Sequence, residues 1–199
     1  NRPAAGSIHV LGTDVLSADD AERAAVSRRW GVLFQQGALF SSLTVQENVE
    51  APMRELDHIG PELRAELAQL KIAMVGLPAN ACGKYPSELS GGMQKRAGLA
   101  RALALDPEIV FLDEPTAGLD PIGADAFDQL IRQLKESLGL TVFMVTHDLD
   151  SLHAICDRIA VLAEKKVLVT GTMTEMLKVD HPWIHEYFHG PRARAAMAG

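Results

Sequence analysis

The chain has 199 residues, of which 47% are hydrophobic, and a formal net charge of −7. The apolar content is sufficient for one domain with a sizeable core. The acidic balance disfavours a large nucleic-acid-binding surface, so no nucleic-acid partner is predicted. No apolar stretch approaches the roughly 18–20 residues of a membrane-spanning helix, so we expect any membrane attachment to go through a partner.

The first part of the chain predicts two strands around one charged helix. Residues 7–11 indicate a short strand, and residues 19–29 a helix with a solvated face. The apolar run at 30–34 predicts a buried strand. Gln35 follows this strand, where an amide can reach a metal ion or a water, although polar residues at strand ends often have no such role. Gln36 is adjacent, so the interpretation is ambiguous by one residue.

Residues 37–105 predict a helical block. Residues 37–43 predict a loop with exposed apolar side chains, although Leu39, Phe40 and Leu43 fit an ordinary core as well. Thr44 and Glu47 fit a capping box for a helix that runs to about residue 56. A second helix is predicted for residues 62–75. We expect four of its side chains to form a stripe in the core, namely Leu63, Leu67, Leu70 and Met74.

The run Leu-Ser-Gly-Gly-Met-Gln-Lys-Arg at residues 89–96 predicts a helix start that can hold a phosphate. Ser90 is a good N-cap, and Gly91 and Gly92 allow close approach to the backbone. Open N–H groups and the helix dipole attract phosphate at such a position. Taken alone, Ser-Gly-Gly is equally typical of an ordinary turn before a helix.

Two adjacent carboxylates, Asp113 and Glu114, follow an apolar run at 109–112. The run is short enough for a strand buried on both faces of a parallel sheet, and open α/β sheets bind ligands at the carboxyl ends of such strands. One acid there can hold Mg²⁺ and the next can orient or deprotonate a water. An isolated Asp-Glu pair is usually a solvated loop. The pair and the glycine-rich helix start, separated by one helix, favour a functional site.

The last part of the chain predicts a second polar cluster at the same edge. The turn-rich loop at 115–121 contains Asp120, which can also simply cap the helix expected at 122–138. The β-branched, apolar run at 140–145 predicts a buried strand, and His147 after it would lie near the acidic pair. Further elements are expected in this order: a helix at 149–156, strands at 158–162 and 166–169 forming a hairpin, and a last helix from residue 171.

Together these motifs resemble the ATPase subunits of ATP-binding cassette (ABC) transporters. Residues 89–94 are similar to the signature motif, with Met93 where glutamine is commoner, and residues 109–114 are similar to the Walker-B strand. The resemblance implies an α/β, P-loop NTPase-like fold with a mostly parallel sheet. It divides the chain into an α/β core at 1–36 and 106–180, a helical subdomain at 37–105 and a C-terminal tail at 181–199.

The resemblance implies ATP and Mg²⁺ as cofactors and gives roles to the predicted site residues. Gln35 matches the Q-loop glutamine and, with Asp113, would serve Mg²⁺. Glu114 would act on the attacking water as the catalytic base. His147 matches the switch histidine and would contact the γ-phosphate.

The resemblance also implies a head-to-tail dimer of two copies of the chain. Ser90, Gly91 and Gly92 of one copy would close over the ATP held by the other. Asp120 matches the D-loop acid and would lie at the same nucleotide-binding site.

The 199 residues contain no phosphate-binding loop of the form G-x-x-x-x-G-K-[ST]. Residues 1–8 resemble the segment that follows the P-loop helix in this family, so we expect the N-terminal strands and the P-loop to be missing from the chain. The 199-residue chain alone is therefore predicted to have no ATPase activity and to leave a sheet edge uncovered.

Residues 33–40, 86–93 and 181–191 are similar to Mla-type ATPases, which maintain lipid asymmetry. This resemblance implies phospholipid transport across the bacterial envelope, by a subunit located at the cytoplasmic face of the inner membrane. Its implied partners are transmembrane permease subunits, one of which would dock on residues 37–43, and a periplasmic lipid-binding subunit. Another ABC importer is the first alternative. A DNA-repair or translation ATPase is less favoured, because the chain has neither long coiled coils nor a basic surface.

Overall fold

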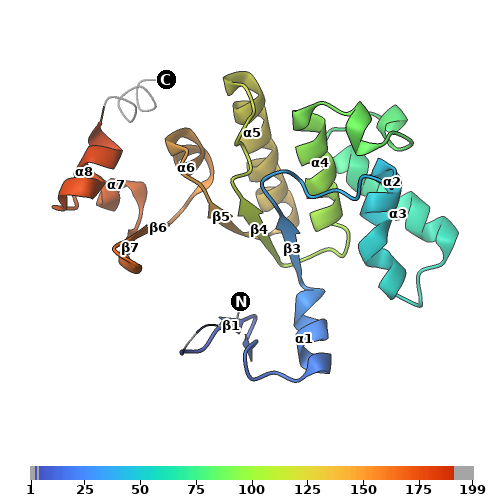
Figure 1. Cartoon of the computed structure of the whole chain (residues 1–199), viewed down its shortest axis with the longest axis horizontal. Coiled ribbons are helices and arrows are strands. Elements are labelled where there is room, and N and C mark those ends of the chain that lie inside the picture. The colour runs from blue at the N-terminus through green and yellow to red at the C-terminus, as the bar shows by residue number, and fades with distance from the viewer. Residues whose placement is uncertain (1–2, 4, 191–199) are drawn as a thin grey trace. The chain divides into compact units, whose positions relative to one another are not determined.

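The structure is a computed structural model that describes residues 3 and 5–190. The chain forms two compact units. The first contains residues 1–115 and 135–145, and the second contains residues 116–134 and 146–199. Each unit is described by itself, with the elements labelled as in Figure 1.

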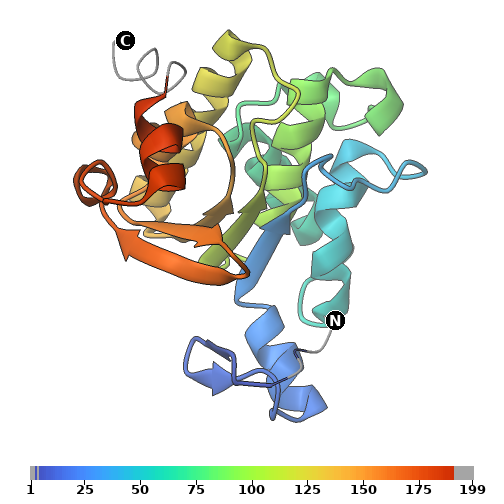
Figure 2. The same cartoon turned by 60° about the vertical axis from the view of Figure 1, so that its left-hand side comes forward.

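The first unit is built on a three-stranded parallel sheet in the order β3-β4-β5 (Figure 2). The strands are β3 (Trp30–Leu33), β4 (Ile109–Asp113) and β5 (Thr141–Val145). Leu33 lies opposite Leu112, and Leu112 opposite Met144, so the three strands end at nearly the same level. The predicted parallel α/β sheet is confirmed.

The two faces of this sheet differ in burial. Leu33, Val110 and Leu112 on one face are at most 2% exposed. On the other face the Trp30 and Phe111 rings meet edge to face with centroids 6.0 Å apart. The ring centroids of Phe111 and Phe143 are 5.6 Å apart.

The prediction of a fully buried strand at 140–145 is wrong. Within the described residues β5 pairs only with β4, so it is an edge strand. Its outward-facing Phe143 and Val145 are 59% and 50% exposed. The apolar composition identified the strand but could not show that this face has no covering layer.

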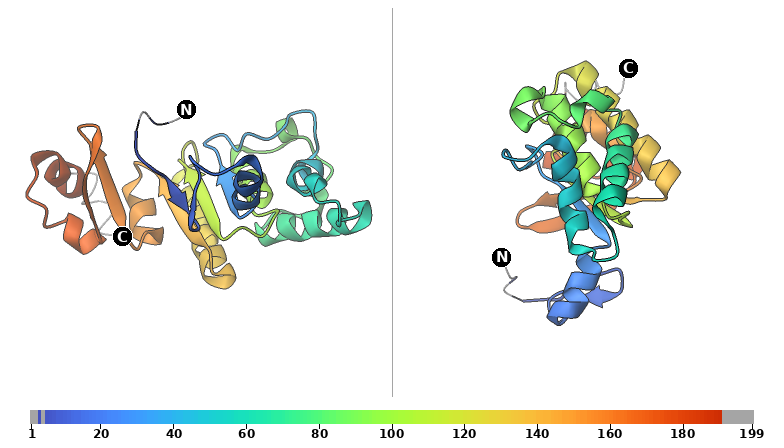
Figure 3. Two further views of the ribbon diagram at one scale, coloured as in Figure 1. Left: turned by 90° about the horizontal axis from the view of Figure 1, so that it is seen from below. Right: turned by 90° about the vertical axis from the view of Figure 1, so that its right-hand side faces the viewer.

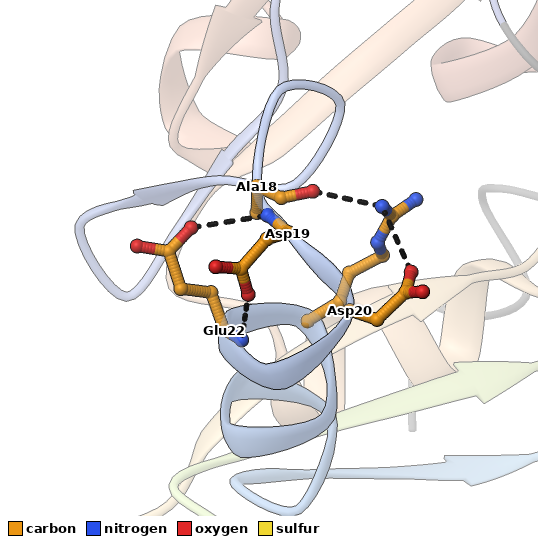
Figure 4. Close-up of polar contacts among 5 residues, drawn as sticks. Ala18, Asp19, Asp20 and Glu22 are labelled. Atoms are coloured by element: carbon orange, nitrogen blue, oxygen red, sulfur yellow. Dashed lines mark hydrogen bonds and ion pairs between the residues drawn. The ribbon is translucent and has the colours of Figure 1, made fainter.

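The N-terminal segment carries a small antiparallel pair, β1 (His9–Val10) and β2 (Thr13–Asp14), followed by α1 (Asp20–Ser27). A capping box starts α1 (Figure 4). The Glu22 amide donates to the Asp19 carboxylate at 2.8 Å, and the Asp19 amide donates to the Glu22 carboxylate at 3.1 Å. Two otherwise unpaired N–H groups are thereby satisfied.

The block between β3 and β4 is helical, as predicted, and lies beside β3 in Figure 1. The predicted capping box at Thr44 and Glu47 is confirmed, and the helix that it starts continues as a 3₁₀ helix to residue 55. The elements of the block are α2 (Val45–Glu50), η1 (Ala51–Glu55), α3 (Pro61–Met74), η2 (Ala79–Ala81), η3 (Pro86–Glu88) and α4 (Gly91–Ala102).

The predicted core stripe of α3 is wrong. Leu63 and Leu70 are 49% and 54% exposed, and Leu67 and Met74 are only half-buried. The buried face of α3 instead carries Ala68, Lys71 and Ile72. Helix α3 packs against α2 and α4, and Lys71 pairs with Asp106, which follows α4. Leucine spacing alone does not show which side of a helix meets its neighbours.

The second unit contains most of α5 (Pro121–Leu138), whose last turn belongs to the first unit. It continues with α6 (Leu149–Ile155), the predicted hairpin β6 (Ile159–Ala163) and β7 (Lys166–Gly171), α7 (Met173–Met176) and α8 (Pro182–His189) (Figure 3, left). One apolar cluster joins these elements, and it is made of Leu152, Ile159, Val161, Met176, Ile184 and Phe188. The rest of the predicted tail, residues 191–199, lies outside the described residues.

Candidate functional site

Three predicted site residues come together at the carboxyl edge of the sheet in the first unit. Gln35 follows β3 after one residue, Asp113 is the last residue of β4, and Glu114 comes directly after it. Because β3 and β4 are parallel and end level, the two loops leave the sheet at the same edge. Gln35 and Asp113 are exposed and Glu114 is half-buried. Amide and carboxylate oxygens in this position suit a hard cation such as Mg²⁺.

Glu114 has an unusual backbone conformation. Its φ is +45°, in the left-handed region where side chains other than glycine are unfavourable. Its amide donates to the carbonyl of Val145, at the end of β5, at 2.8 Å. Residues with strained backbones persist where their surroundings hold them, and they concentrate at functional sites.

Lys95 connects these segments and was not singled out from the sequence. Its ammonium donates to the Gln35 carbonyl at 2.9 Å and to the Glu114 carbonyl at 3.2 Å. The residue is only 6% exposed. Burial lowers the pKa of Lys95, and the nearby Glu114 charge partly opposes this effect. The available sequence signal was its position on the face of α4 shared with the buried Leu99 and Ala102.

The predicted helix start at Ser90 is confirmed. Ser90 is the N-cap of α4, and its hydroxyl accepts from the Met93 amide at 3.3 Å. Ser90 and Gly91 are exposed, and a Cβ on Gly91 would meet no atom within 4 Å. Gln94 donates to the Pro86 carbonyl at 3.0 Å, which holds the preceding turn. The helix tip is therefore open to a ligand or a partner at its first turn.

The side chains of Arg101 and Asn48 hold the backbone of the loop that is predicted to dock a partner. Arg101 donates to the carbonyls of Gly37 at 2.9 Å and Ala38 at 2.7 Å, and its guanidinium lies 5.7 Å from the centroid of the Phe40 ring. The fully buried Asn48 accepts from the Phe40 amide at 2.7 Å and donates to the Phe40 carbonyl at 3.1 Å. Phe40 itself remains 54% exposed. The loop thus presents an aromatic side chain on a fixed backbone.

A pocket of about 500 Å³ opens beside this loop in the first unit. Its walls combine aromatic and apolar side chains with one guanidinium, a lining typical of sites that take an amphipathic partner. Among the lining residues are Trp30, Phe34, Phe40, Pro52, Arg101 and Leu105.

His147 and Asp120 belong to the second unit. His147 is exposed, two residues after β5, and its carbonyl accepts from the Tyr187 hydroxyl at 2.7 Å. Asp120 accepts from the Gly123 amide at 2.9 Å, so the helix-capping role holds. The predicted approach of His147 to Asp113 and Glu114 stays a prediction, because the histidine belongs to the second unit and the two acids to the first.

The second unit also contains a buried polar cluster. The Thr116 and Ser151 hydroxyls are 3.3 Å apart, and Ser151 donates to the Asp128 carboxylate at 2.7 Å. Asp128 is 3% exposed, and its Oδ1 has no hydrogen-bond partner among the described residues. Burial raises the pKa of Asp128 to about 6, with smaller contributions from Asp148 and other nearby acids. Sequence reasoning missed this acid, because position 128 lies inside a helix with no motif around it.

Within the described residues, no group of three or more His, Cys, Asp or Glu side chains is arranged to hold a metal ion. The predicted Mg²⁺ ligands, Gln35 and Asp113, therefore stay a prediction that rests on the chemistry of their oxygens. Of the helices that the structure describes, none has both the length and the apolar character needed to cross a bilayer.

Comparison with known protein families gives two overlapping matches. The ABC transporter family model matches residues 1–117. An AAA-domain model matches residues 84–152. The first match alone covers more than half of the chain and includes β3, the helical block and β4.

Several curated proteins are similar over nearly the whole chain. The intermembrane phospholipid transport system ATP-binding protein MlaF of Haemophilus influenzae is 38% identical over 94% of this chain and 71% of its own length. The "Probable ribonucleotide transport ATP-binding protein mkl" of Mycobacterium tuberculosis is 37% identical over 96% of this chain and 53% of its own. The methionine import ATP-binding protein MetN of Caulobacter vibrioides is 41% identical over 87% and 52%. The chain thus spans about half the length of the mkl and MetN proteins.

Two solved structures of the ATP-binding cassette MJ0796 share the fold. A dimer in a post-hydrolysis state, bound to ADP and Pi, has a TM-score of 0.77 and 32% identity, covering 86% of this chain and 75% of that one. A second dimeric structure of the same cassette has a TM-score of 0.78.

Proposed function

The chain belongs to the ABC transporter family, and we propose that it forms part of an ATP-binding subunit that hydrolyses ATP to drive transport. The main support for this proposal is that the parallel strands β3 and β4 end at nearly the same level of the sheet. Gln35, Asp113 and Glu114 therefore lie at one edge of it. A site for a phosphate and its metal ion needs such a group of oxygen ligands and a base.

The proposed roles follow from chemistry and position. Asp113 and the Gln35 side chain would hold Mg²⁺, which neutralises charge on the phosphates when bound. Glu114 would take a proton from the attacking water as the water approaches phosphorus. His147 would hydrogen-bond the γ-phosphate. Because phosphoryl transfer depends mostly on positioning and electrostatics, the geometry of these groups determines the rate.

We propose that two copies act together. The exposed Ser90 and Gly91 and the half-buried Gly92 at the tip of α4 would bind the phosphates held by the second copy, with Asp120 at the same site. The dimeric MJ0796 cassettes support this arrangement.

A transmembrane permease subunit is the proposed partner of the loop that contains Phe40. An amphipathic helix of the permease would place apolar side chains in the adjacent pocket, where Arg101 could meet a polar or acidic group. This docking would hold the subunit at the cytoplasmic face of the bacterial inner membrane.

Phospholipid is the proposed cargo, because MlaF is similar over 94% of the chain, and a periplasmic lipid-binding subunit would complete the system. Methionine import is the alternative supported by the likeness to MetN. ATPase activity of the reconstituted transporter distinguishes them. Stimulation by phospholipid vesicles with a lipid-binding subunit supports the first, and stimulation by methionine with its binding protein supports the second.

The central test is Glu114→Gln in the full-length protein. We expect ATP binding to remain and turnover to fall by about 10²–10⁴-fold, the usual contribution of a general base. Fluorescent-nucleotide binding and phosphate release provide the two measurements.

The matched control is Glu108→Gln, at the residue directly before β4, as Glu114 is the residue directly after it. Glu108 is exposed and pairs with Arg29, so its neutralisation should leave turnover unchanged. Normal turnover in Glu114→Gln would remove Glu114 from the catalytic role.

A further inference from the structure

One buried cation joins the two loops that carry the proposed hydrolytic groups. Lys95 lies on α4, its ammonium donates to the carbonyls of Gln35 and Glu114, and the residue is 6% exposed. We propose that Lys95 is a positioning residue that fixes the backbones of Gln35 and Glu114 relative to each other. The inference rests on the proposed ATP hydrolysis and assigns Lys95 no contact with nucleotide.

Burial of an ammonium is unfavourable unless hydrogen bonds replace its water shell. Methionine, similar in length and apolar, would fill the same space without that desolvation penalty. The charge at position 95 is therefore best explained by what it binds, which is one carbonyl from each of two loops at the site. Hydrogen bonds from a charged donor are stronger than those between neutral groups.

Lys95 thus forms a bridge between the carbonyls of Gln35 and Glu114. At Glu114 this bridge holds a residue with a strained backbone. Glu114 has a φ of +45°, and its amide is held by the Val145 carbonyl at 2.8 Å. With its carbonyl held by Lys95, the peptide groups on both sides of its Cα are fixed. The direction of its Cα–Cβ bond is thereby set, which limits the positions that the carboxylate of a base can take toward one water.

At the other end, Lys95 holds Gln35 at the start of the loop whose later residues are held by Arg101 and Asn48. The Gln35 side chain is exposed and follows the last residue of β3 by two positions. Lys95 ties its carbonyl to α4, the helix whose tip carries Ser90. A shift of α4 would move both loops together, so the metal-binding amide and the base would keep their spacing.

The test compares Lys95→Met with Lys71→Met in the full-length protein. Lys71 is a second buried lysine of the first unit, 4% exposed, but it pairs with Asp106 away from the site. We expect Lys95→Met to lower kcat by about 10²-fold, because small misplacements of reacting groups reduce the rate by this much. The KM for MgATP should change by less than about threefold. Lys71→Met should keep kcat even if its melting temperature falls. Lys95→Arg should recover part of the loss, because a guanidinium can also donate to two carbonyls.

A wild-type kcat in Lys95→Met would overturn the proposal. Equal losses of kcat in both methionine variants would also overturn it, because a general weakening of the fold would then explain the result.

Hydrogen exchange on the 199-residue chain separates this inference from the proposed function. Lys95→Met should accelerate exchange at the amides of Gly37 and Glu114, which donate to Phe34 and Val145, while Lys71→Met should not. If the full-length wild-type protein hydrolyses no ATP, the proposed function fails, and the exchange result decides whether Lys95 holds the two loops. Unchanged exchange at both amides would overturn the bridge.

Discussion

Asp128 is a buried acid whose protonation should leave a measurable trace in stability. Its pKa is raised to about 6 by burial, above the value near 3.9 of an unfolded aspartate. Between about pH 4 and pH 6 the folded state therefore binds more protons than the unfolded state. Its contribution to the free energy of unfolding is largest at low pH and is lost as pH rises through about 6.

We expect Asp128→Asn to remove this dependence. Relative to the wild type, the variant should gain on the order of 2 kcal/mol between pH 4 and pH 7. Urea unfolding at several pH values measures the difference. Asp125→Asn, an exposed acid on the same helix that accepts from Gln129, is the control and should keep most of the wild-type pH dependence, because its charge is only a minor cause of the raised pKa. Parallel curves for Asp128→Asn would show that burial does not perturb this acid.

Residue roles that depend on neighbours close in the sequence could be predicted. Roles that depend on residues far apart in the sequence could not. The N-caps at Thr44 and Ser90 involve residues three positions away, and both are confirmed. The bridge from Lys95 reaches Gln35, 60 positions earlier. No local pattern encodes that contact.

Helix α4 packs on β3 at closer range than any side chain would permit. A Cβ on Gly31 would lie 2.0 Å from the carbonyl oxygen of Ala102. The backbone of the helix and the strand are therefore in direct contact at this point, and this contact sets the position of Lys95 and of the helix tip.

We predict that Gly31→Ala loses about 3 kcal/mol or more of stability, at the upper end of the range for overpacked cores, since the clash is with backbone. Thermal unfolding followed by circular dichroism measures the loss. Gly83→Ala, where a Cβ would meet no atom within 4 Å, is the matched control and should stay near the wild type. Similar melting temperatures for both variants would contradict the close contact.

Helices and strands were easier to predict than the packing of other elements around them. The parallel strands, the helical block and the β6–β7 hairpin follow from apolar runs and turn residues, and all are confirmed. The outward leucines of α3 and the exposed face of β5 were not foreseen. Periodicity shows that an element has an apolar face, but not whether another element covers it.

In the first unit, one sheet face is apolar and partly open. Trp30 and Phe111 are half-buried, and Phe143 is 59% exposed. Strands β3 and β5, which pair only with β4 among the described residues, are both edges. Exposed apolar faces and free edges promote association.

We expect Phe143→Lys to raise the monomeric fraction of the 199-residue chain, because a charge on this face opposes stacking of two sheets. Light scattering and sedimentation velocity measure the change. Leu63→Lys, at a similarly exposed leucine on α3, tests whether the effect belongs to the sheet face. Equal gains in both variants would point to general solubility instead.

At the level of the whole molecule, the family and its ABC fold were predictable because the motifs occur in a fixed order. Gln35, Asp113 and Glu114 lie at one sheet edge, as the parallel topology requires. The meeting with His147 stays a prediction, since it depends on how two compact units sit together and no local pattern specifies that.

At Glu114 the left-handed backbone costs stability, while the proposed catalytic role requires the carboxylate. Glycine would relieve roughly 1–2 kcal/mol of strain there. A screen that selects only for thermal stability would therefore favour Glu114→Gly, which removes the carboxylate. A designer who seeks a more durable version of this protein should therefore hold position 114 constant and look for gains elsewhere.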